Sequence, residues 1–110
     1  MERCKGGIKE TIRMRIKILS SALEDLYEAR LFYEQQGVGV GDYFFDSLFS
    51  DIDSLVLYGG IHRKVAGYHR LLSKRFPYAI YYTMENQDLI LVKRVLDFRQ
   101  DPKKIRRALR

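Results

Sequence analysis

Two neighbouring apolar runs in the second half of the chain limit most strongly what it can fold into. Residues 78–84 and 89–96 are rich in Tyr, Ile, Leu and Val, and the residues between them, 85–88, are all polar. Runs of this length and composition are typical of β-strands, and an Asn such as Asn86 tolerates the backbone angles of a tight turn. The pattern therefore predicts a β-hairpin with its turn inside residues 85–88.

Two further segments read as strands. From residue 12 to residue 18, apolar residues alternate with Arg13, Arg15 and Lys17, which predicts a half-buried strand with one cationic face. Residues 68–76 predict another strand, although polar and apolar side chains are mixed on both of its faces. Such mixing suits an edge strand or a strand with one functional face.

Between the first strand and the later strands, apolar residues at helical spacing predict two helices. In residues 20–36, Ser21 and Glu24 have the spacing of a capping box, and Gly37 is expected to end the helix in the left-handed conformation. A second helix is expected from residue 41 to residue 58, with Asp42 as a possible cap. The glycine-rich residues 37–41 lack the Lys-Ser/Thr of a phosphate-binding loop and predict the turn of a helical hairpin. The apolar side of the second helix is formed by Phe44, Phe45, Leu48, Phe49, Ile52, Leu55 and Val56.

A short last helix completes the pattern. Asp101 can cap it, Pro102 suits its first turn, and only Ile105, Ala108 and Leu109 can anchor it. The element order is strand, helix, helix, strand, strand, strand, short helix. This order predicts an α+β domain, a helical hairpin packed on a mainly antiparallel four-stranded sheet. At 110 residues we expect one domain over residues 13–110, preceded by a flexible leader, residues 1–12.

Charge is distributed unevenly along the chain. The net charge is +6, but residues 1–19 carry +4, residues 20–60 carry −7 and residues 61–110 carry +9. An acidic middle and basic ends predict two surfaces of opposite sign, of which the basic one suits an acidic partner. No run of 18 apolar residues and no secretion signal are present, so we expect a cytoplasmic protein. The single cysteine, Cys4, offers neither an internal disulfide nor a zinc site, and no cofactor or metal is expected.

Several motifs together resemble the RelE/ParE superfamily, the toxins of bacterial type II toxin–antitoxin systems. They are residues 18–22, Ala29, Tyr33, Arg70, the string Arg-Phe-Pro-Tyr-Ala-Ile-Tyr-Tyr at residues 75–82, and Arg-Gln-Asp-Pro at residues 99–102. The resemblance implies a single toxin domain and a cognate antitoxin that wraps and suppresses it.

The superfamily has two modes of action. The RNA-cleaving branch typically has Arg after the first Tyr of the third strand and a Tyr or His near the C-terminus. This chain has Ala79 after Tyr78, neither Tyr nor His beyond Arg99, and Ile105 about where the terminal Tyr is expected. His62 and His69 could supply an acid or base, but they lie upstream of the usual position.

The departures favour the ParE branch, which binds and inhibits DNA gyrase and needs no catalytic residue. No catalytic residue is assigned, and whether the protein is an enzyme stays open. The alternatives are a ribosome-dependent mRNA endoribonuclease and a non-toxic basic module that binds nucleic acid. The partners are then an antitoxin with gyrase, or with the ribosome and mRNA. The candidate target-binding residues are Arg70, Lys74, Arg75, Tyr78, Tyr82, Arg99, Arg106 and Arg107, since guanidinium groups pair bidentately with phosphate or carboxylate.

Overall fold

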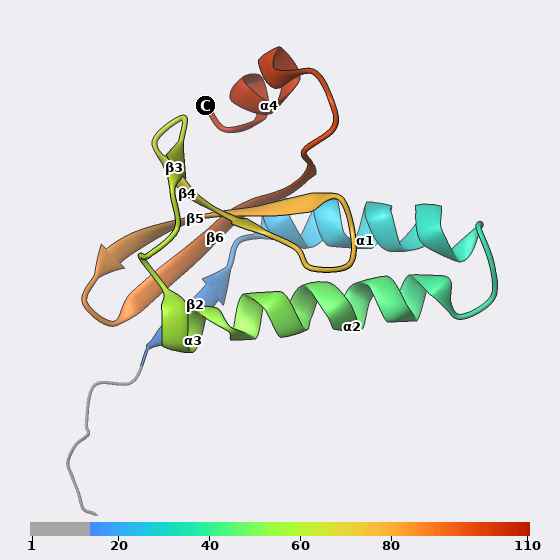
Figure 1. Cartoon of the computed structure of the whole chain (residues 1–110), viewed down its shortest axis with the longest axis horizontal. Coiled ribbons are helices and arrows are strands. Elements are labelled where there is room, and N and C mark those ends of the chain that lie inside the picture. The colour runs from blue at the N-terminus through green and yellow to red at the C-terminus, as the bar shows by residue number, and fades with distance from the viewer. Residues whose placement is uncertain (1–13) are drawn as a thin grey trace, which may run out of the picture.

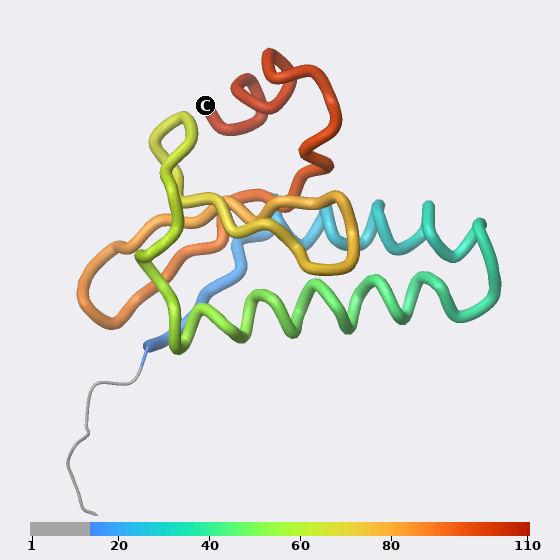
Figure 2. Tube along the Cα trace, in the orientation of Figure 1, coloured from blue at the N-terminus to red at the C-terminus, as the bar shows by residue number. Residues whose placement is uncertain are grey.

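A computed structural model describes residues 14–110 (Figures 1 and 2). The expected leader, residues 1–12, and the start of the first strand lie outside the described residues. The elements in chain order are β2 (Arg15–Ile18), α1 (Ser20–Glu34), α2 (Val40–Asp53), α3 (Leu55–Tyr58), β3 (Lys64–Val65), β4 (Tyr68–Leu72), β5 (Tyr78–Asn86), β6 (Leu89–Asp97) and α4 (Pro102–Ala108).

The strands form one sheet in the order β2-β6-β5-β4-β3. Strand β2 runs parallel to β6, and the other pairs are antiparallel. The α+β class is confirmed, but within residues 14–110 the sheet has five strands instead of the four expected. The extra strand, β3, folds back on β4 through a two-residue turn in which Ala66 and Gly67 both have positive φ, 54° and 86°. A strand of two residues is too short to be recognised from the periodicity of the sequence.

The predicted hairpin is present as β5 and β6, with longer strands than expected. Asn86 pairs with Leu89, so that only Gln87 and Asp88 form the turn. Strand β4, in contrast, ends at Leu72, four residues earlier than predicted. There the Ser73 N–H donates to the carbonyl of Tyr78 and begins the turn into β5.

The helix ends differ from the sequence predictions. The capping box is wrong: α1 has no side-chain cap, and the Ser21 hydroxyl instead donates to the carbonyl of Lys93 in β6 at 2.7 Å. Helix α1 also ends before Gly37. The left-handed glycine is Gly39 (φ 85°), at the start of α2. The Glu34 carboxylate accepts from the N–H groups of Gly39 and Gly41 at 3.1 and 2.9 Å, so Glu34 has the capping role expected of Asp42.

The second predicted helix is divided at Ser54 into α2 and α3. The Ser54 hydroxyl donates to the carbonyl of Asp51 at 2.6 Å, and the chain bends at this point. The last helix is confirmed. Asp101 accepts from the N–H of Lys103 at 2.9 Å, and Pro102 opens the first turn.

The sheet has a hydrophobic cluster on each face, with α1 and α2 on one side and α4 on the other (Figure 1). Adjacent residues of β5, such as Tyr81 and Tyr82, point to opposite faces, as in any β-strand. The larger cluster is Ala22, Leu26, Ala29, Phe44, Leu48, Ile52, Leu55, Ile80, Tyr82, Ile90, Val92 and Val95. The smaller cluster is Ala79, Tyr81, Leu96, Ile105 and Leu109.

Candidate interaction surface

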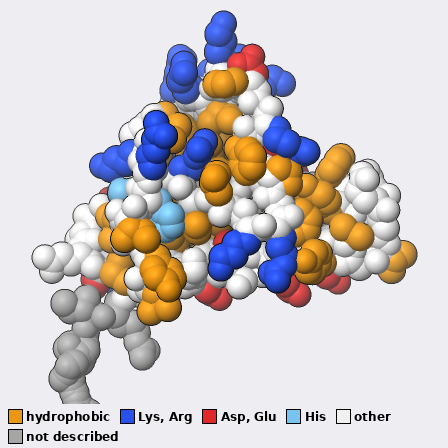
Figure 3. Space-filling view, in the orientation of Figure 1, with side chains coloured by type: hydrophobic (Ala, Val, Ile, Leu, Met, Phe, Trp, Pro, Cys, Tyr) orange, Lys and Arg blue, Asp and Glu red, His pale blue; other side chains and the backbone are white. Residues whose placement is uncertain are grey.

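Among the described residues, most of the predicted target-binding cations have no carboxylate partner. Within residues 14–110, the ion pairs are Arg15–Asp88, Arg30–Asp42, Arg94–Asp25 and Arg99–Asp97. Figure 3 shows Lys and Arg side chains gathered over α4 and around β3 and β4, while Asp and Glu lie mainly along the edge formed by α2. Of the six predicted cations, only Arg99 belongs to one of these pairs.

The strongest of these pairs joins a helix to the sheet and was missed by the sequence reasoning. Arg94 of β6 donates to both carboxylate oxygens of Asp25 in α1, at 2.7 and 2.9 Å. Asp25 also accepts from the N–H of Val95 at 3.0 Å, and Arg94 reaches the carbonyl of Ala108 at 3.2 Å. The hydrogen bonds that Arg94 donates to Asp25 raise the pKa of Arg94. A lone Arg inside an apolar strand was the available signal, but its partner is 69 residues away.

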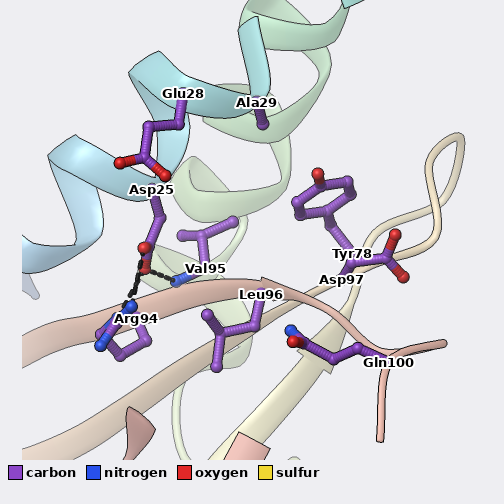
Figure 4. A pocket seen from close by; sticks show the side chains of 9 residues that line it. All are labelled: Asp25, Glu28, Ala29, Tyr78, Arg94, Val95, Leu96, Asp97 and Gln100. Carbon is purple, nitrogen blue, oxygen red and sulfur yellow. Dashed lines mark hydrogen bonds and ion pairs between the residues drawn. The ribbon is translucent and has the colours of Figure 1, made fainter. Parts of the chain in front are cut away.

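An open groove of about 360 Å³ lies beside this pair, between α1 and the end of β6 (Figure 4). Strand β2 pairs with β6 only as far as Val92, so the later residues of β6 form the floor of the groove. Its lining is Asp25, Glu28, Ala29, Tyr78, Arg94, Val95, Leu96, Asp97 and Gln100. Burial, assisted by nearby Tyr33 and Asp97, raises the pKa of Tyr78 to about 12. Tyr78 therefore keeps its proton at neutral pH.

Arg99 is paired with Asp97, one of the residues that line this groove. Its guanidinium donates to both oxygens of Asp97, at 3.1 and 2.8 Å, and its backbone N–H donates to Asp97 at 2.8 Å. These bonds lower the pKa of Asp97 and raise the pKa of Arg99. A paired guanidinium attracts an outside anion less strongly than a free one. The geometry thus separates Arg99 from the other predicted cations.

Arg70 and Arg106 meet on the opposite face of the sheet. Arg70 of β4 and Arg106 of α4 line one cavity of about 140 Å³ together with the buried Tyr81. Burial raises the pKa of Tyr81, and the guanidinium of Arg70 opposes this shift. The remaining lining residues are Val65, Phe98, Pro102 and Ile105.

Lys74 and Arg75 are exposed on the turn that joins β4 to β5. The turn is anchored by Phe76, whose ring centroid lies 4.9 Å from that of Tyr33 and 5.0 Å from that of Phe44. The Ser73 hydroxyl also donates to Asp51 at 2.7 Å. These contacts hold the two cations outward on a fixed loop. Arg107, on α4, is likewise exposed.

The histidines and Tyr82 form a packed group. Tyr82 is fully buried, its hydroxyl accepts from the N–H of Gly60 at 2.9 Å, and the same hydroxyl lies against Nδ1 of His62. The ring of His69 stacks on Tyr82 at 5.1 Å, and its Nδ1 lies 2.7 Å from the carbonyl of His62. Burial, with His69 close by, lowers the pKa of His62, so its ring is neutral at neutral pH and Nδ1 can accept a hydrogen bond from the Tyr82 hydroxyl. Tyr82 therefore lies in the core and has no exposed surface for a partner.

The comparisons with known proteins agree with this architecture. The sequence model of the ParE toxin of the type II toxin–antitoxin system parDE matches residues 16–102. The chain belongs to the ParE toxin family. The superfamily resemblance inferred from the motifs is therefore confirmed.

A solved structure of the chromosomal ParDE toxin–antitoxin system from P. aeruginosa has the same fold as this ParE-family chain. The TM-score is 0.65 at 16% identity, over 77% of this chain and 96% of that one. A search of curated proteins gave no match. No helix within residues 14–110 is long and apolar enough to cross a membrane.

In this ParE-family fold, the eight predicted residues fall into separate groups. Arg70 and Arg106 line one cavity, and Lys74 and Arg75 lie on one turn. Tyr78 lines the groove between α1 and β6, and Arg99 lies close to Tyr78. Tyr82 is in the core, and Arg107 is exposed on α4. The sequence could select the residue types, but which of them converge depends on how α4 docks.

Proposed function

We propose that this ParE-family protein arrests growth by binding DNA gyrase and inhibiting it, as a protein ligand and not as a catalyst. The observation that carries the proposal is the set of cations without a carboxylate partner inside residues 14–110. They are Arg70, Lys74, Arg75, Arg106 and Arg107. Unpaired cations of one sign steer an acidic macromolecule to the surface and pair with its carboxylates or phosphates.

A non-catalytic role is supported by the residue at the position where the RNA-cleaving branch has Arg. It is Ala79 here, fully buried under α4. The neighbouring candidates for proton transfer are also engaged: Tyr78 keeps its proton, since its pKa is raised to about 12, and His62 lies against Tyr82. Cleavage of RNA through its 2′-hydroxyl needs a base, an acid and cations close together. Of Tyr78, His62 and the cations within residues 14–110, only the cations remain free for such a role.

We further propose that a cognate antitoxin neutralises the protein and covers apolar side chains on the helical hairpin. Tyr27 and Leu31 lie one turn apart on α1 and are 51% and 67% exposed, and Tyr43 of α2 is 53% exposed. Exposed apolar rows of this kind suit the apolar face of a partner helix or an extended tail.

The decisive experiment compares two targets with the same purified protein. We expect it to block supercoiling of relaxed plasmid by gyrase and to leave mRNA intact on ribosomes. The Arg75→Ala variant is expected to need roughly tenfold more protein for half inhibition, the scale of one lost charge-assisted hydrogen bond. Lys17→Ala, on the far edge strand β2, is the matched control because it removes one positive charge elsewhere.

Each other outcome contradicts a defined part of the proposal. Ribosome-dependent cleavage of mRNA with unaffected supercoiling would replace it with the endoribonuclease alternative. Salt-sensitive binding to nucleic acid without growth arrest would indicate a non-toxic module. Equal inhibition by a folded Arg75→Ala variant would remove Arg75 from the surface.

The antitoxin is tested by co-expression with the small open reading frame beside the gene. We expect growth to resume and the two proteins to purify together. Leu31→Glu is expected to weaken the complex at least tenfold without unfolding the toxin, since it places a charge against an apolar partner. Glu28→Gln, one turn earlier and exposed, is the control. Full affinity with Leu31→Glu would place the antitoxin on another surface.

A further inference from the structure

The cavity between the sheet and α4 has an uncommon lining, in which every polar side chain is a hydrogen-bond donor. Arg70 enters from β4 and Arg106 from α4, and the Tyr81 hydroxyl is supplied by β5. The other side chains are apolar. A guanidinium has five N–H donors, no acceptor and a permanent positive charge.

Tyr81 is the residue that indicates a ligand. Its side chain is fully buried, and no group among residues 14–110 accepts the proton of its hydroxyl. The nearby Arg70 can only donate, so it cannot accept the phenolic proton even when it approaches the oxygen. Buried polar groups are usually paired, and a buried hydroxyl without an acceptor costs free energy. An acceptor brought from outside would satisfy it.

We infer that this cavity binds an oxyanion, a carboxylate or a phosphate group, held by Arg70, Arg106 and the Tyr81 hydroxyl. Two guanidinium groups supply charge-assisted hydrogen bonds, and the phenol supplies one more. The volume of about 140 Å³ fits a small anionic group with a short apolar attachment against Val65 and Ile105. The inference does not depend on gyrase as the target.

Such a ligand would connect α4 to the sheet, since one arginine comes from each side. α4 is held to the sheet by the buried Ile105, by Leu109 directly after its last turn, and by the bond that Arg94 donates to the Ala108 carbonyl. An oxyanion bridging Arg70 and Arg106 therefore holds the helix more firmly. Slower hydrogen exchange in α4 is thus a second readout of binding.

The test titrates the purified protein with inorganic phosphate in a chloride buffer of constant ionic strength. Amide chemical shifts are followed in β5 and α4, and hydrogen exchange is followed in α4. We expect saturable shifts near Tyr81 and Ile105, with binding about tenfold weaker in Tyr81→Phe and in Arg106→Gln. Acetate replaces phosphate in a parallel titration, which distinguishes the two sources of the oxyanion.

Arg107→Gln is the matched control, because Arg107 is its neighbour on α4 but is not among the residues that line the cavity. Binding should be unchanged in this variant. The inference is overturned if neither anion gives saturable shifts. It is also overturned if Tyr81→Phe binds as tightly as the original protein, or if Arg107→Gln weakens binding as much as Arg106→Gln.

Discussion

The two faces of the sheet are covered in different ways. On one face, the two helices of the helical hairpin bury aromatic and aliphatic side chains, and the Tyr82 hydroxyl accepts a hydrogen bond. On the other face, a seven-residue helix and the residue after it bury Ile105 and Leu109, and the proton of the Tyr81 hydroxyl has no acceptor among the described residues. The first face stabilises the domain. The second face has cations, a cavity and a buried hydroxyl whose proton has no acceptor among the described residues. These are features of a ligand-binding surface.

The largest change in stability is expected when an aromatic ring is removed from the core on the first face. Phe44 is fully buried, and its ring centroid lies 4.9 Å from Tyr33 and 5.1 Å from Tyr78. Phe44→Ala is expected to lower the free energy of unfolding by about 4 kcal/mol, measured by urea denaturation. Phe32→Ala, 52% exposed on α1, is the control and should cost under about 1 kcal/mol. Similar costs for both would contradict the assignment of the main core.

The next largest effect tests the junction of α1 with the sheet. Asp25→Ala leaves Arg94 and the Val95 N–H without their partner. We expect a loss of about 2 kcal/mol, below the value for a fully buried pair because the Arg94 side chain is 26% exposed. Glu28→Ala, one turn further along α1, should have almost no effect. A loss that disappears in high salt would show that the pair acts as a surface contact.

A smaller and local effect is expected on the second face. Ile105→Ala removes one of the two buried anchors of α4 and should cost about 2 kcal/mol, the low end for such a change. Hydrogen exchange should accelerate in α4 while the amides of β5 and β6 keep their protection. Lys104→Ala, exposed on the same helix, is the control. Equal acceleration in β5 would mean that the two faces unfold together.

Two tyrosine substitutions compare the faces directly. Tyr81→Phe removes a hydroxyl that has no partner within residues 14–110, and it should raise the free energy of unfolding by about 1 kcal/mol. Tyr82→Phe removes a hydroxyl that accepts from Gly60 and lies against His62, and it should lower the free energy by a similar amount. Thermal and urea denaturation measure both. The same sign for both variants would contradict the comparison.

The smallest effect concerns the exposed pair beside the groove. Arg99 holds the pKa of Asp97 below its ordinary 3.8, so the pair stabilises the fold at neutral pH. That contribution is lost as the pH falls through the lowered pKa, because the folded state must then take up the proton. Denaturation of Asp97→Asn should show a deficit at pH 7 that shrinks below about pH 4. Asp53→Asn controls for the lost charge, and a deficit independent of pH would contradict the assignment.

Features set by local spacing could be predicted from the sequence, and features set by contacts between distant residues could not. The apolar spacing of α2 and the alternation in β5 predicted the core, including Phe44, Leu48 and the opposite faces of Tyr81 and Tyr82. Ser21 looked like a helix cap because its partner in β6 is 72 residues away. Glu34 caps α2 only because the hairpin turn brings it back to Gly39 and Gly41.

The same limit applies to the candidate site. Arg70 and Arg106 were both selected as cations, yet their convergence on Tyr81 follows from the docking of α4. Arg99 was selected for the same reason, but Asp97, two residues earlier, neutralises it. Residue type predicted which groups can bind an anion. Only the tertiary arrangement determines which of them remain available.

The parallel pairing of β2 with β6 also has a consequence for synthesis. The first described strand finds its neighbour only at Leu89–Val92, after the first three helices and strands β3 to β5 have been made. On the ribosome, an emerging chain can fold α1 against α2 early, but β2 must remain an open edge until β6 appears. A nascent copy therefore cannot complete its sheet, and its anion-binding face, before translation has passed through nearly all of the described sequence.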